Sequence, residues 1–312
     1  PSSIDGRSHR RLVGPATWAS ASVLAWGAGV LTAPPVDAVT LRPASEGDMG
    51  HEAGQQRGAV AGAWRYPVKS FQGSAVDRLE LGQRGAAGDR AYGLIDVGSG
   101  RLLSAKRMKH LLEAGADDEG FSLPDGTTRR YDDPDVDEIL SAWLGRPVHL
   151  ARPDDADLGG ATVAYEMTFD PPNDDADLFD IPTPTGTFLD LADVHLLTTA
   201  TLDGCRGARP DLDWDVRRFR PNLLVAAEGP MFLEQDWLGR RLRVGGAVLS
   251  VDQPTVRCAM PLRAQPGGIA REPGLFRAMS ELNELAPNHL GVYCTVVEPG
   301  PVAVGDPVVL ED

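Results

Sequence analysis

From residue 59 onward, the chain alternates short apolar stretches with turns rich in glycine and proline. Apolar stretches at residues 60–66, 76–81 and 91–97 have the length of single strands, and residues 98–100, Gly-Ser-Gly, form a turn after the third. Short stretches separated by tight turns are typical of antiparallel strands. The first half of the chain therefore predicts a strand meander that forms a small barrel or sandwich.

Two other segments have the spacing of helices. In residues 133–145, apolar side chains recur every three and four positions, which gives one apolar stripe, and Gly145 is placed to end that helix. A second helix is expected at residues 275–285, with Leu285 buried, and a short one from Thr198 through Leu202. The second half otherwise predicts strands at residues 194–197, 222–227, 241–244, 247–251, 292–297, 302–304 and 308–310. The expected fold class is mainly β with a few helices (α+β).

The chain divides into segments of different character. In residues 1–58, a basic pair at positions 10 and 11 precedes an apolar run diluted by small residues. We interpret this stretch as a disordered leader or non-native extension, with an export signal as the alternative. Residues 153–180 carry nine acidic side chains and no Lys or Arg, which favours a solvated loop over a metal site. We expect an N-terminal β-barrel-like domain at 59–152, an acidic linker at 153–189 and a second β-barrel domain at 190–312.

Composition and charge narrow the function. The 312 residues include 30 Lys and Arg against 45 Asp and Glu, a net charge of −15, which argues against nucleic acid or an anionic membrane as a partner. Three cysteines are too few for a disulfide framework and form no CxxC pair. The sequence also lacks the GxGxxG, GxxxxGK[ST], GxSxG and HExxH motifs, so several common enzyme classes are disfavoured.

Candidate anion-binding residues stand at strand ends. Lys69 and Ser70 directly follow the first strand, and a cation, a hydroxyl and turn N–H groups suit a phosphate. Arg90 precedes a later strand, where it reaches the same anion or pairs with Asp89. Three arginines lie within residues 217–220. This cluster is compatible both with an anion clamp and with a solvated strand edge. Arg220 and Asn222 would point the same way on an extended chain.

Cys258 is the candidate for chemistry. It follows a strand, and the adjacent Arg257 would lower the thiol pKa; the thiolate is both the nucleophile and the metal ligand. A lone cysteine is usually inert and buried, and we interpret Cys205 and Cys294 in that way. His195 lies among apolar residues, which favours a hydrogen-bonded core histidine.

Five segments, in order, resemble those of MOSC proteins (molybdenum cofactor sulfurase C-terminal domain) that carry an N-terminal MOSC β-barrel domain. They are Tyr-Pro-Val-Lys-Ser at 66–70, Gly-Asp-Arg at 88–90, Arg-Phe-Arg-Pro-Asn at 218–222, Arg-Cys at 257–258 and Val-Gly-Asp at 304–306. Within that family the chain is similar to the amidoxime-reducing components. The resemblance covers about residues 59–312.

This resemblance implies a molybdenum cofactor (molybdopterin) and an oxidoreductase that reduces N-hydroxylated substrates by two electrons. It implies that Cys258 is the catalytic residue and the molybdenum ligand, with Arg257 beside it. It further implies a cofactor-binding set of Lys69, Ser70, Arg90, Arg220, Asn222, Arg257 and Tyr293. A soft thiolate suits molybdenum, and the cofactor itself carries the redox step.

The sequence departs from the amidoxime-reducing pattern just after Cys258. Residues 259–262 are Ala-Met-Pro-Leu where those enzymes have Thr-Thr-Val-Asp, and Thr255 stands where a second cysteine is common. These changes alter the wall beside the metal and leave the substrate open. Two other hypotheses remain: a sulfur carrier or sulfurtransferase that uses a Cys258 persulfide, and a non-catalytic cofactor-binding protein.

The expected partners follow from the same features. No flavin, haem or iron–sulfur motif is present, so a separate electron-transfer protein or reductase is implied alongside a small-molecule substrate. We expect no nucleic-acid or membrane partner. The expected location is cytoplasmic, or outside the cell if residues 1–48 are a genuine export signal.

Overall fold

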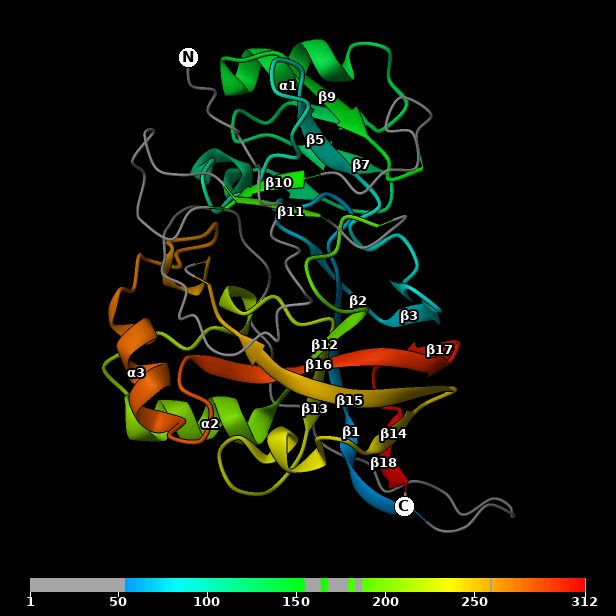
Figure 1. The fold of residues 1–312 in the computed structure, drawn as a ribbon, viewed down its shortest axis with the longest axis vertical. Helices are drawn as coiled ribbons and strands as arrows, with labels where there is room; N and C mark the ends of the chain where they lie inside the picture. The colour runs from blue at the N-terminus through cyan, green and yellow to red at the C-terminus, as the bar shows by residue number, and fades with distance from the viewer. Residues whose placement is uncertain (1–53, 155–163, 168–178, 183–186, 259, 312) are drawn as a thin grey trace, which may run out of the picture.

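The computed structural model describes residues 54–154, 164–167, 179–182, 187–258 and 260–311. Its lower half in Figure 1 is a closed β-barrel, in which seven strands pair in the order β13-β12-β16-β15-β14-β18-β1 and β1 returns to β13. A further strand, β2, pairs with β1. The bounds are β1 Gln55–Arg65, β2 Ser74–Val76, β12 Val194–Thr198, β13 Leu223–Ala226, β14 Arg241–Val244, β15 Ala247–Val256, β16 His289–Glu298 and β18 Pro307–Glu311.

Alternating side chains fill the barrel. In β14, Leu242 and Val244 are buried whereas Arg241 is exposed, as expected where successive residues of a strand face opposite sides. The Gly245-Gly246 turn joins β14 to β15, with Val244 opposite Ala247. Gly245 has φ +54°, and a Cβ there would collide with Asp306, so this tight hairpin requires glycine.

The first strand belongs to the same barrel as the last. β1 pairs antiparallel with β18, with Gln55 opposite Leu310, and with β13 on its other side (Figure 1). Outside the barrel, β3 (Arg78–Gly82) pairs with β17 (Gly300–Ala303) and with β4 (Gly85–Ala86). Residues 55–58, assigned from the sequence to the leader, therefore lie in a strand. The division into domains at residues 59–152, 153–189 and 190–312 remains a prediction. β1, from the first of these segments, pairs with β13 and β18 of the last.

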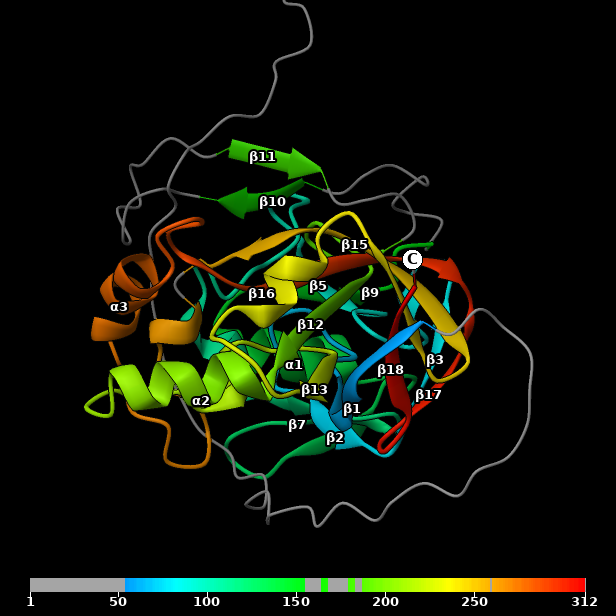
Figure 2. The ribbon, with the colours of Figure 1, turned by 90° about the horizontal axis from the view of Figure 1, so that it is seen from below.

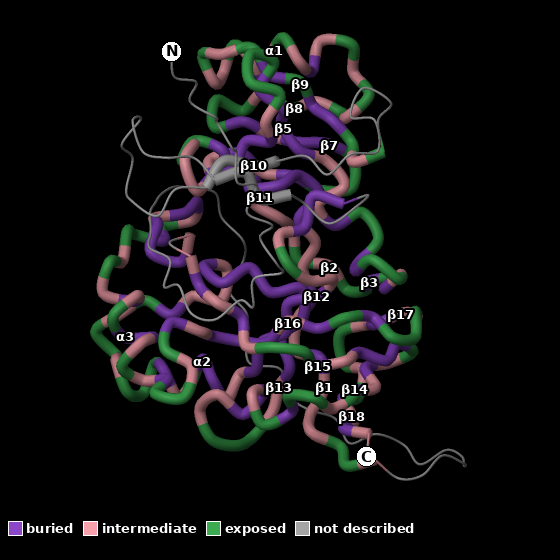
Figure 3. Tube along the Cα trace, in the orientation of Figure 1, coloured by how far each residue is buried: buried purple, intermediate pink, exposed green. Residues whose placement is uncertain are grey.

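The upper region in Figure 1 has its own core. Its strands are β5 (Gly93–Asp96), β6 (Gly115–Ala116), β7 (Gly120–Ser122), β8 (Thr128–Arg130) and β9 (Val148–Ala151), with α1 (Val136–Leu144) beside β9. Gly145 ends α1 in the left-handed conformation, φ +66°, as its position after the apolar stripe predicts. Buried residues gather in this region separately from those of the barrel (Figure 3).

A third apolar cluster packs under α2 (Thr199–Ala208) and α3 (Gly274–Leu282), which lie on one side of the barrel (Figure 2). Both helices differ from the sequence expectation. The first extends to Ala208 rather than Leu202, and Cys205 is buried inside it. The second ends at Leu282, so Leu285 is 98% exposed rather than buried; α3 instead buries Leu275, Ala278 and Met279.

The expected fold class is confirmed: the described residues form mostly strands, with three α-helices and a closed barrel. Part of the acidic linker is not a loop, because β10 (Ala164–Met167) and β11 (Phe179–Pro182) pair antiparallel there. Most of residues 1–58, and much of the linker, lie outside the described residues. Four short 3-10 helices complete the described elements: Lys109–Glu113, Val216–Arg218, Leu233–Trp237 and Met260–Leu262. Within this part of the chain, no helix has the length and apolarity of a membrane span.

Candidate functional site

A small cavity of about 70 Å³ lies where the upper region meets the barrel. Loops at the end of β1 and before β5 line it from one side, and β12, β16 and the segment before β13 line it from the other. Six residues proposed from the sequence line this one cavity: Lys69, Ser70, Arg90, Arg220, Asn222 and Tyr293. The fold therefore brings together segments that are more than 200 residues apart.

The backbone around this cavity is strained. Ser70 has φ +72°, Arg90 has φ +47° and Arg220 has φ +52°, the left-handed region that non-glycine residues rarely adopt. Only two other non-glycine residues in the described ranges have positive φ, and neither lines the cavity. Such strain costs free energy and gathers at functional sites.

Two arginines stack on one aromatic ring beside the cavity. The guanidinium carbons of Arg90 and Arg220 lie 4.6 and 4.2 Å from the ring centre of Tyr66. Arg90 forms an ion pair with Asp89. Arg220 is 8% exposed, and its Nη1 has no hydrogen-bond partner. Burial, and then the charge of Arg90, lower the pKa of Arg220 to about 10, although Asp89 and Asp190 act in the opposite direction. Arg220 is therefore a buried cation with one unpaired N–H group.

Asp190 and Lys106 complete the cavity, and the sequence reasoning missed both. Lys69 Nζ donates to Asp190 Oδ1 at 2.8 Å and to the Phe188 carbonyl at 2.6 Å. Lys106 Nζ lies 3.7 Å from Asp190 Oδ2. Burial acts to raise the pKa of Asp190, but Lys106 and Lys69 hold it below its usual range. The only signal in the sequence for Asp190 is its position four residues before the strand expected at residues 194–197.

Asn222 acts on its neighbours rather than presenting free groups to the cavity. Its Oδ1 accepts from the His195 backbone N–H at 3.1 Å, and its Nδ2 donates to Asp89 Oδ2 at 3.0 Å. Asp89 also accepts from the Tyr66 backbone N–H at 2.7 Å. Asn222 thereby fixes the carboxylate that orients Arg90.

Arg257 lies behind the cavity and contacts it through His195. Its guanidinium donates to the Leu290 and Phe219 carbonyls, and its Nη2 lies 3.1 Å from His195 Nε2. His195 is buried, as expected for a core histidine, but its ring also lines the cavity. Burial, and then the charge of Arg257, hold the pKa of His195 well below its usual value, so the imidazole is a neutral acceptor.

Cys258 is partly buried and lies two residues after the end of β15. It does not line the cavity itself, but its neighbours do: Tyr293 and Met260. The Cys258 charge acts on Arg257, Arg263 and Tyr293, so the thiol lies close to two buried guanidinium groups. Across the described ranges, no three His, Cys, Asp or Glu side chains gather as a metal site. Cys294, in contrast, is fully buried in the barrel, and burial raises its pKa.

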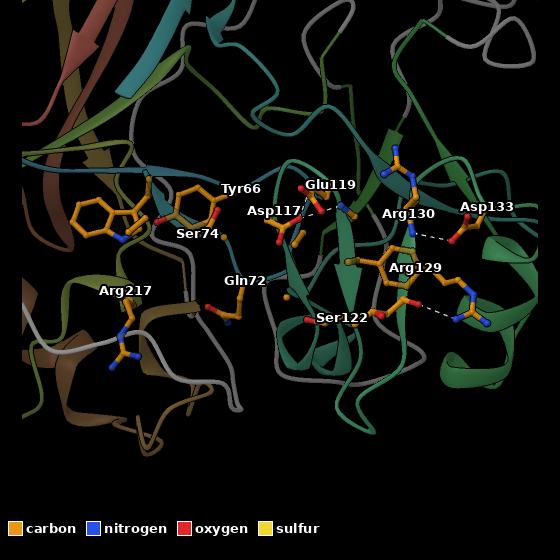
Figure 4. A pocket seen from close by; sticks show the side chains of 18 residues that line it. Tyr66, Gln72, Ser74, Asp117, Glu119, Ser122, Arg129, Arg130, Asp133 and Arg217 are labelled. Atoms are coloured by element: carbon orange, nitrogen blue, oxygen red, sulfur yellow. Dashed lines mark hydrogen bonds between the residues drawn. The ribbon is translucent and has the colours of Figure 1, made fainter. Parts of the chain in front are cut away.

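The other two arginines of the 217–220 segment do not belong to this cavity. Arg217 pairs with Asp215 and lines a separate cleft of about 820 Å³ (Figure 4). In this view Tyr66 and Arg217 lie at one end, and Arg129 and Arg130 at the other. Tyr66 lines the larger cleft while Arg90 and Arg220 stack on its ring, so this ring lies between the cleft and the small cavity.

Arg218 holds the loop that follows Cys258. Its side chain is fully buried and donates to the carbonyls of Pro261, Arg263 and Ala270 at 2.8–3.1 Å. Its Nη2 also contacts Asp213. The three arginines therefore have different roles: Arg217 pairs with Asp215 beside the larger cleft, Arg218 fixes a loop, and Arg220 faces the cavity.

The fold and site define a class of protein, a two-part β protein whose junction gathers buried cationic side chains near a cysteine. The chain belongs to the MOSC-domain family: the MOSC domain matches residues 185–309, and the MOSC N-terminal beta barrel domain matches residues 57–141. MOSC domains are associated with binding of the molybdenum cofactor.

Similarity to individual proteins is lower. The chain is 24% identical over 288 residues to human mitochondrial amidoxime-reducing component 1, covering 82% of this chain and 84% of that protein. Among solved structures, YuaD from Bacillus subtilis is 11% identical, with a TM-score of 0.37 and coverage of 81% and 94%. YiiM from Geobacillus stearothermophilus is 20% identical, with a TM-score of 0.30; the match spans 39% of this chain and about half of YiiM, 55%. At these TM-scores the structures support no further conclusion.

The residues present fit an anionic cofactor. Lys69, Arg90, Lys106 and Arg220 line the cavity together with one carboxylate, Asp190, and Arg220 Nη1 has no partner. A volume of about 70 Å³ is far below the roughly 300 Å³ or more of a typical small-molecule site. The cavity as it stands therefore suits the phosphate end of a pterin cofactor rather than the whole group.

The neutral state of His195 leads to a pH prediction. The folded-state pKa lies below the ordinary value of about 6.5, so this contribution to stability is complete above that pH and is lost as the pH falls below it. We expect the free energy of unfolding of the wild type to fall more steeply than that of His195→Gln between about pH 6.5 and pH 5. Urea unfolding across this range checks it; parallel curves would show that His195 does not titrate on unfolding.

Proposed function

We propose that this protein is a molybdenum-cofactor-dependent oxidoreductase that reduces N-hydroxylated (N–O) substrates by two electrons. The observation that carries the proposal is the convergence of strained Ser70, Arg90 and Arg220 on one cavity, where the buried Nη1 of Arg220 has no hydrogen-bond partner. The family membership supports the cofactor, and the 24% identity to an amidoxime-reducing component supports the reaction class.

The residues divide the work of holding the cofactor. Lys69, Arg90 and Arg220 would bind its phosphate, with the Ser70 hydroxyl as a neutral donor. Ser70 Oγ already accepts from the Ala105 N–H at 3.0 Å, which directs its own proton elsewhere. Asn222 orients Arg90 through Asp89, as described above. The bound cofactor would supply the two-electron oxidation and reduction at its metal.

At the other end, the Cys258 thiolate would ligate molybdenum. Arg257 and Arg263 provide positive charge beside this sulfur. Tyr293 contacts His195 edge-on, with ring centres 5.9 Å apart, and lines the cavity between the two ends of the site. Arg257, fixed by backbone carbonyls, holds His195 in place.

Electrons would come from a separate protein, because the sequence has no motif for a flavin, haem or iron–sulfur cluster. The net charge of −15 favours a basic carrier, whose docking would weaken as salt is added. The location that we propose is the cytoplasm.

Metal and pterin analysis tests the proposal. The protein purified from a molybdenum-replete host is expected to contain close to one molybdenum per chain, and Cys258→Ser to contain far less. The purified wild type, given an artificial reductant, is expected to convert benzamidoxime to benzamidine. No molybdenum after cofactor loading in vitro would refute the proposal.

Two other results would point to the alternatives. A persulfide on Cys258, detected by mass spectrometry in a protein without molybdenum, would indicate a sulfur carrier. Stoichiometric molybdenum without turnover of any N-hydroxylated compound would indicate a non-catalytic cofactor-binding protein.

A further inference from the structure

The larger cleft, of about 820 Å³, has no role in the site described so far. One wall is formed by Trp64 of β1 with Ser74 and Ala75 of β2, and the other by residues of β7 and β8 (Figure 4). The two walls belong to different sheets. The volume lies within the range of about 300–1,000 Å³ that is typical of ligand sites, so the cleft is large enough to hold a ligand.

β2 presents a free strand edge to this cleft. Among the described strands it pairs only with β1, where Ala75 lies opposite Trp64. Trp64 donates its backbone N–H to the Asn222 carbonyl at 2.9 Å, on the side of β1 away from β2. Opposed residues of an antiparallel pair either bond each other or both point outward. The N–H and C=O of Ala75 therefore point away from β1, and within the described residues neither has a partner.

The strand edge on the opposite wall is covered by side chains. β8 pairs only with β7 among the described strands, which leaves its other edge outside the ladder. The Arg130 N–H donates to Asp133 Oδ2 at 2.9 Å, and the Thr128 carbonyl accepts from Arg129 Nη1 at 2.8 Å. Proteins commonly protect an edge from unwanted pairing in such ways. An extended segment in the cleft would therefore pair with β2 and not with β8.

The charges that line the cleft favour a basic ligand. Three arginines line it, and each already pairs with an aspartate that is not part of the lining: Arg129, Arg130 and Arg217. Three carboxylates also line it, and none of them forms an ion pair within the described part of the chain: Asp117, Glu119 and Asp133. The charge left unpaired in the cleft is negative, which attracts a cation. The half-buried ring of Trp64 is also a surface on which a lysine or arginine side chain binds well.

The cleft adjoins the cofactor cavity through one side chain. Tyr66 lines the cleft, and Arg90 and Arg220, which line the cavity, stack on its ring. A protein bound in the cleft therefore lies against the same aromatic ring as the residues that we assign to the cofactor phosphate.

We propose that this cleft is a docking site for a partner protein, which inserts an extended basic segment that adds to β2 as a further strand. Backbone hydrogen bonds to the free edge at Ala75 provide affinity, and alternate basic side chains of the segment meet the lining carboxylates. This inference rests on the proposed function in one respect: the partner is then the basic electron carrier, which docks beside Tyr66 and the cofactor.

Peptide binding to the cofactor-free full chain tests the docking site independently of molybdenum. The probe is the peptide Lys-Thr-Lys-Val-Lys-Thr, blocked at both ends and measured by titration calorimetry. It is expected to bind about tenfold or more tightly than Glu-Thr-Glu-Val-Glu-Thr. Two further versions carry N-methyl groups on alternate peptide bonds, in the two possible frames. Only one frame removes the N–H groups that face β2, so only that version should bind severalfold more weakly.

Two variants of the protein test the edge and the charge separately. Ala75→Pro removes the free N–H and keeps the ladder with β1, since that N–H points outward, and should weaken binding about fivefold. Thr128→Pro, the same change on the covered edge, is its control and should leave binding unchanged. Glu119→Gln should weaken binding severalfold at low salt. Its control is Glu284→Gln, a change of an exposed glutamate just after α3, which should have no effect.

Three results would overturn the docking site: equal affinity for the basic and acidic peptides, equal effects of the two N-methylated frames, or an unchanged affinity of Glu119→Gln. In the molybdenum-containing enzyme, the peptide should leave turnover of benzamidoxime driven by dithionite unchanged, because so small a reductant needs no docking. Inhibition of that turnover would contradict the proposal, since the cleft would then hold the substrate. Absence of molybdenum would refute the proposed function alone, and selective peptide binding would still support the docking site.

Discussion

Replacing Arg220 with alanine is expected to lower the molybdenum content about tenfold or more without destabilising the cofactor-free protein. The guanidinium is 8% exposed, and its Nη1 has no partner. A charged hydrogen bond to a cofactor phosphate is worth roughly 1.5–3 kcal/mol, or about 10- to 150-fold in affinity. Without a bound anion, the same cation is repelled by Arg90 and kept from water, which is why its pKa falls to about 10. Its removal should therefore leave the melting temperature of the apo-protein unchanged or raise it.

Arg217→Ala is the matched control for this prediction. Arg217 comes from the same segment, but it pairs with Asp215 and lies outside the cavity. The Arg217→Ala variant should therefore retain molybdenum at the wild-type level. If Arg220→Ala lowers the melting temperature of the apo-protein by several degrees, Arg220 has a structural role. The lower molybdenum content of that variant would then come from damage to the fold and not from a lost contact with the cofactor.

Arg218→Ala is expected to lower the free energy of unfolding by about 3 kcal/mol, among the largest effects for a single change in this chain. The mutation leaves the Pro261, Arg263 and Ala270 carbonyls without their common donor. Asp213 is 46% exposed, so water compensates it and the ion pair adds little. Denaturant unfolding of the cofactor-free protein measures the effect, and the exposed pair of Arg277 and Glu281 provides the control, since Arg277→Ala should change stability by less than about 0.5 kcal/mol.

The Arg218 change should also reach Cys258 through the loop. Without the Arg218 guanidinium that donates to its three carbonyls, the segment after Cys258 should open. The rate of alkylation of Cys258 by iodoacetamide in the cofactor-free protein should then rise severalfold. Cys205 and Cys294 are fully buried, so their alkylation reports global unfolding and corrects for it. An unchanged rate at Cys258 together with lowered stability would show that Arg218 supports the fold but does not position the cysteine loop.

Much of the fold was predictable because it depends on local patterns. The strand at residues 241–244 matches β14 to the residue, and Gly145 ends α1 as the pattern indicates. Helix ends were harder, since tertiary packing decides them. Leu285 fits the apolar spacing of α3, yet the helix stops at Leu282 and the following residues turn back toward β16.

The candidate site was predictable in part for the same reason. Lys69, Arg90 and Arg220 were recognised as strand-end cations, and their convergence depends on pairings that no local pattern records. Asp190 and Lys106 were missed because each looks like an ordinary surface residue until Lys69 is placed beside it. The roles of all these residues remain predictions that the variants above test.

The pairing of β1 with β18 has a consequence for how the molecule forms. Gln55 meets Leu310 in this pairing, so the barrel cannot close during synthesis until the segment Pro307–Glu311 has left the ribosome. Contacts so distant in sequence slow folding, because the chain must close a long loop before they form. Lys69 follows β1, whereas Arg220 precedes β13, the strand on its other side. Insertion of a cofactor would therefore be among the last events in the maturation of this protein.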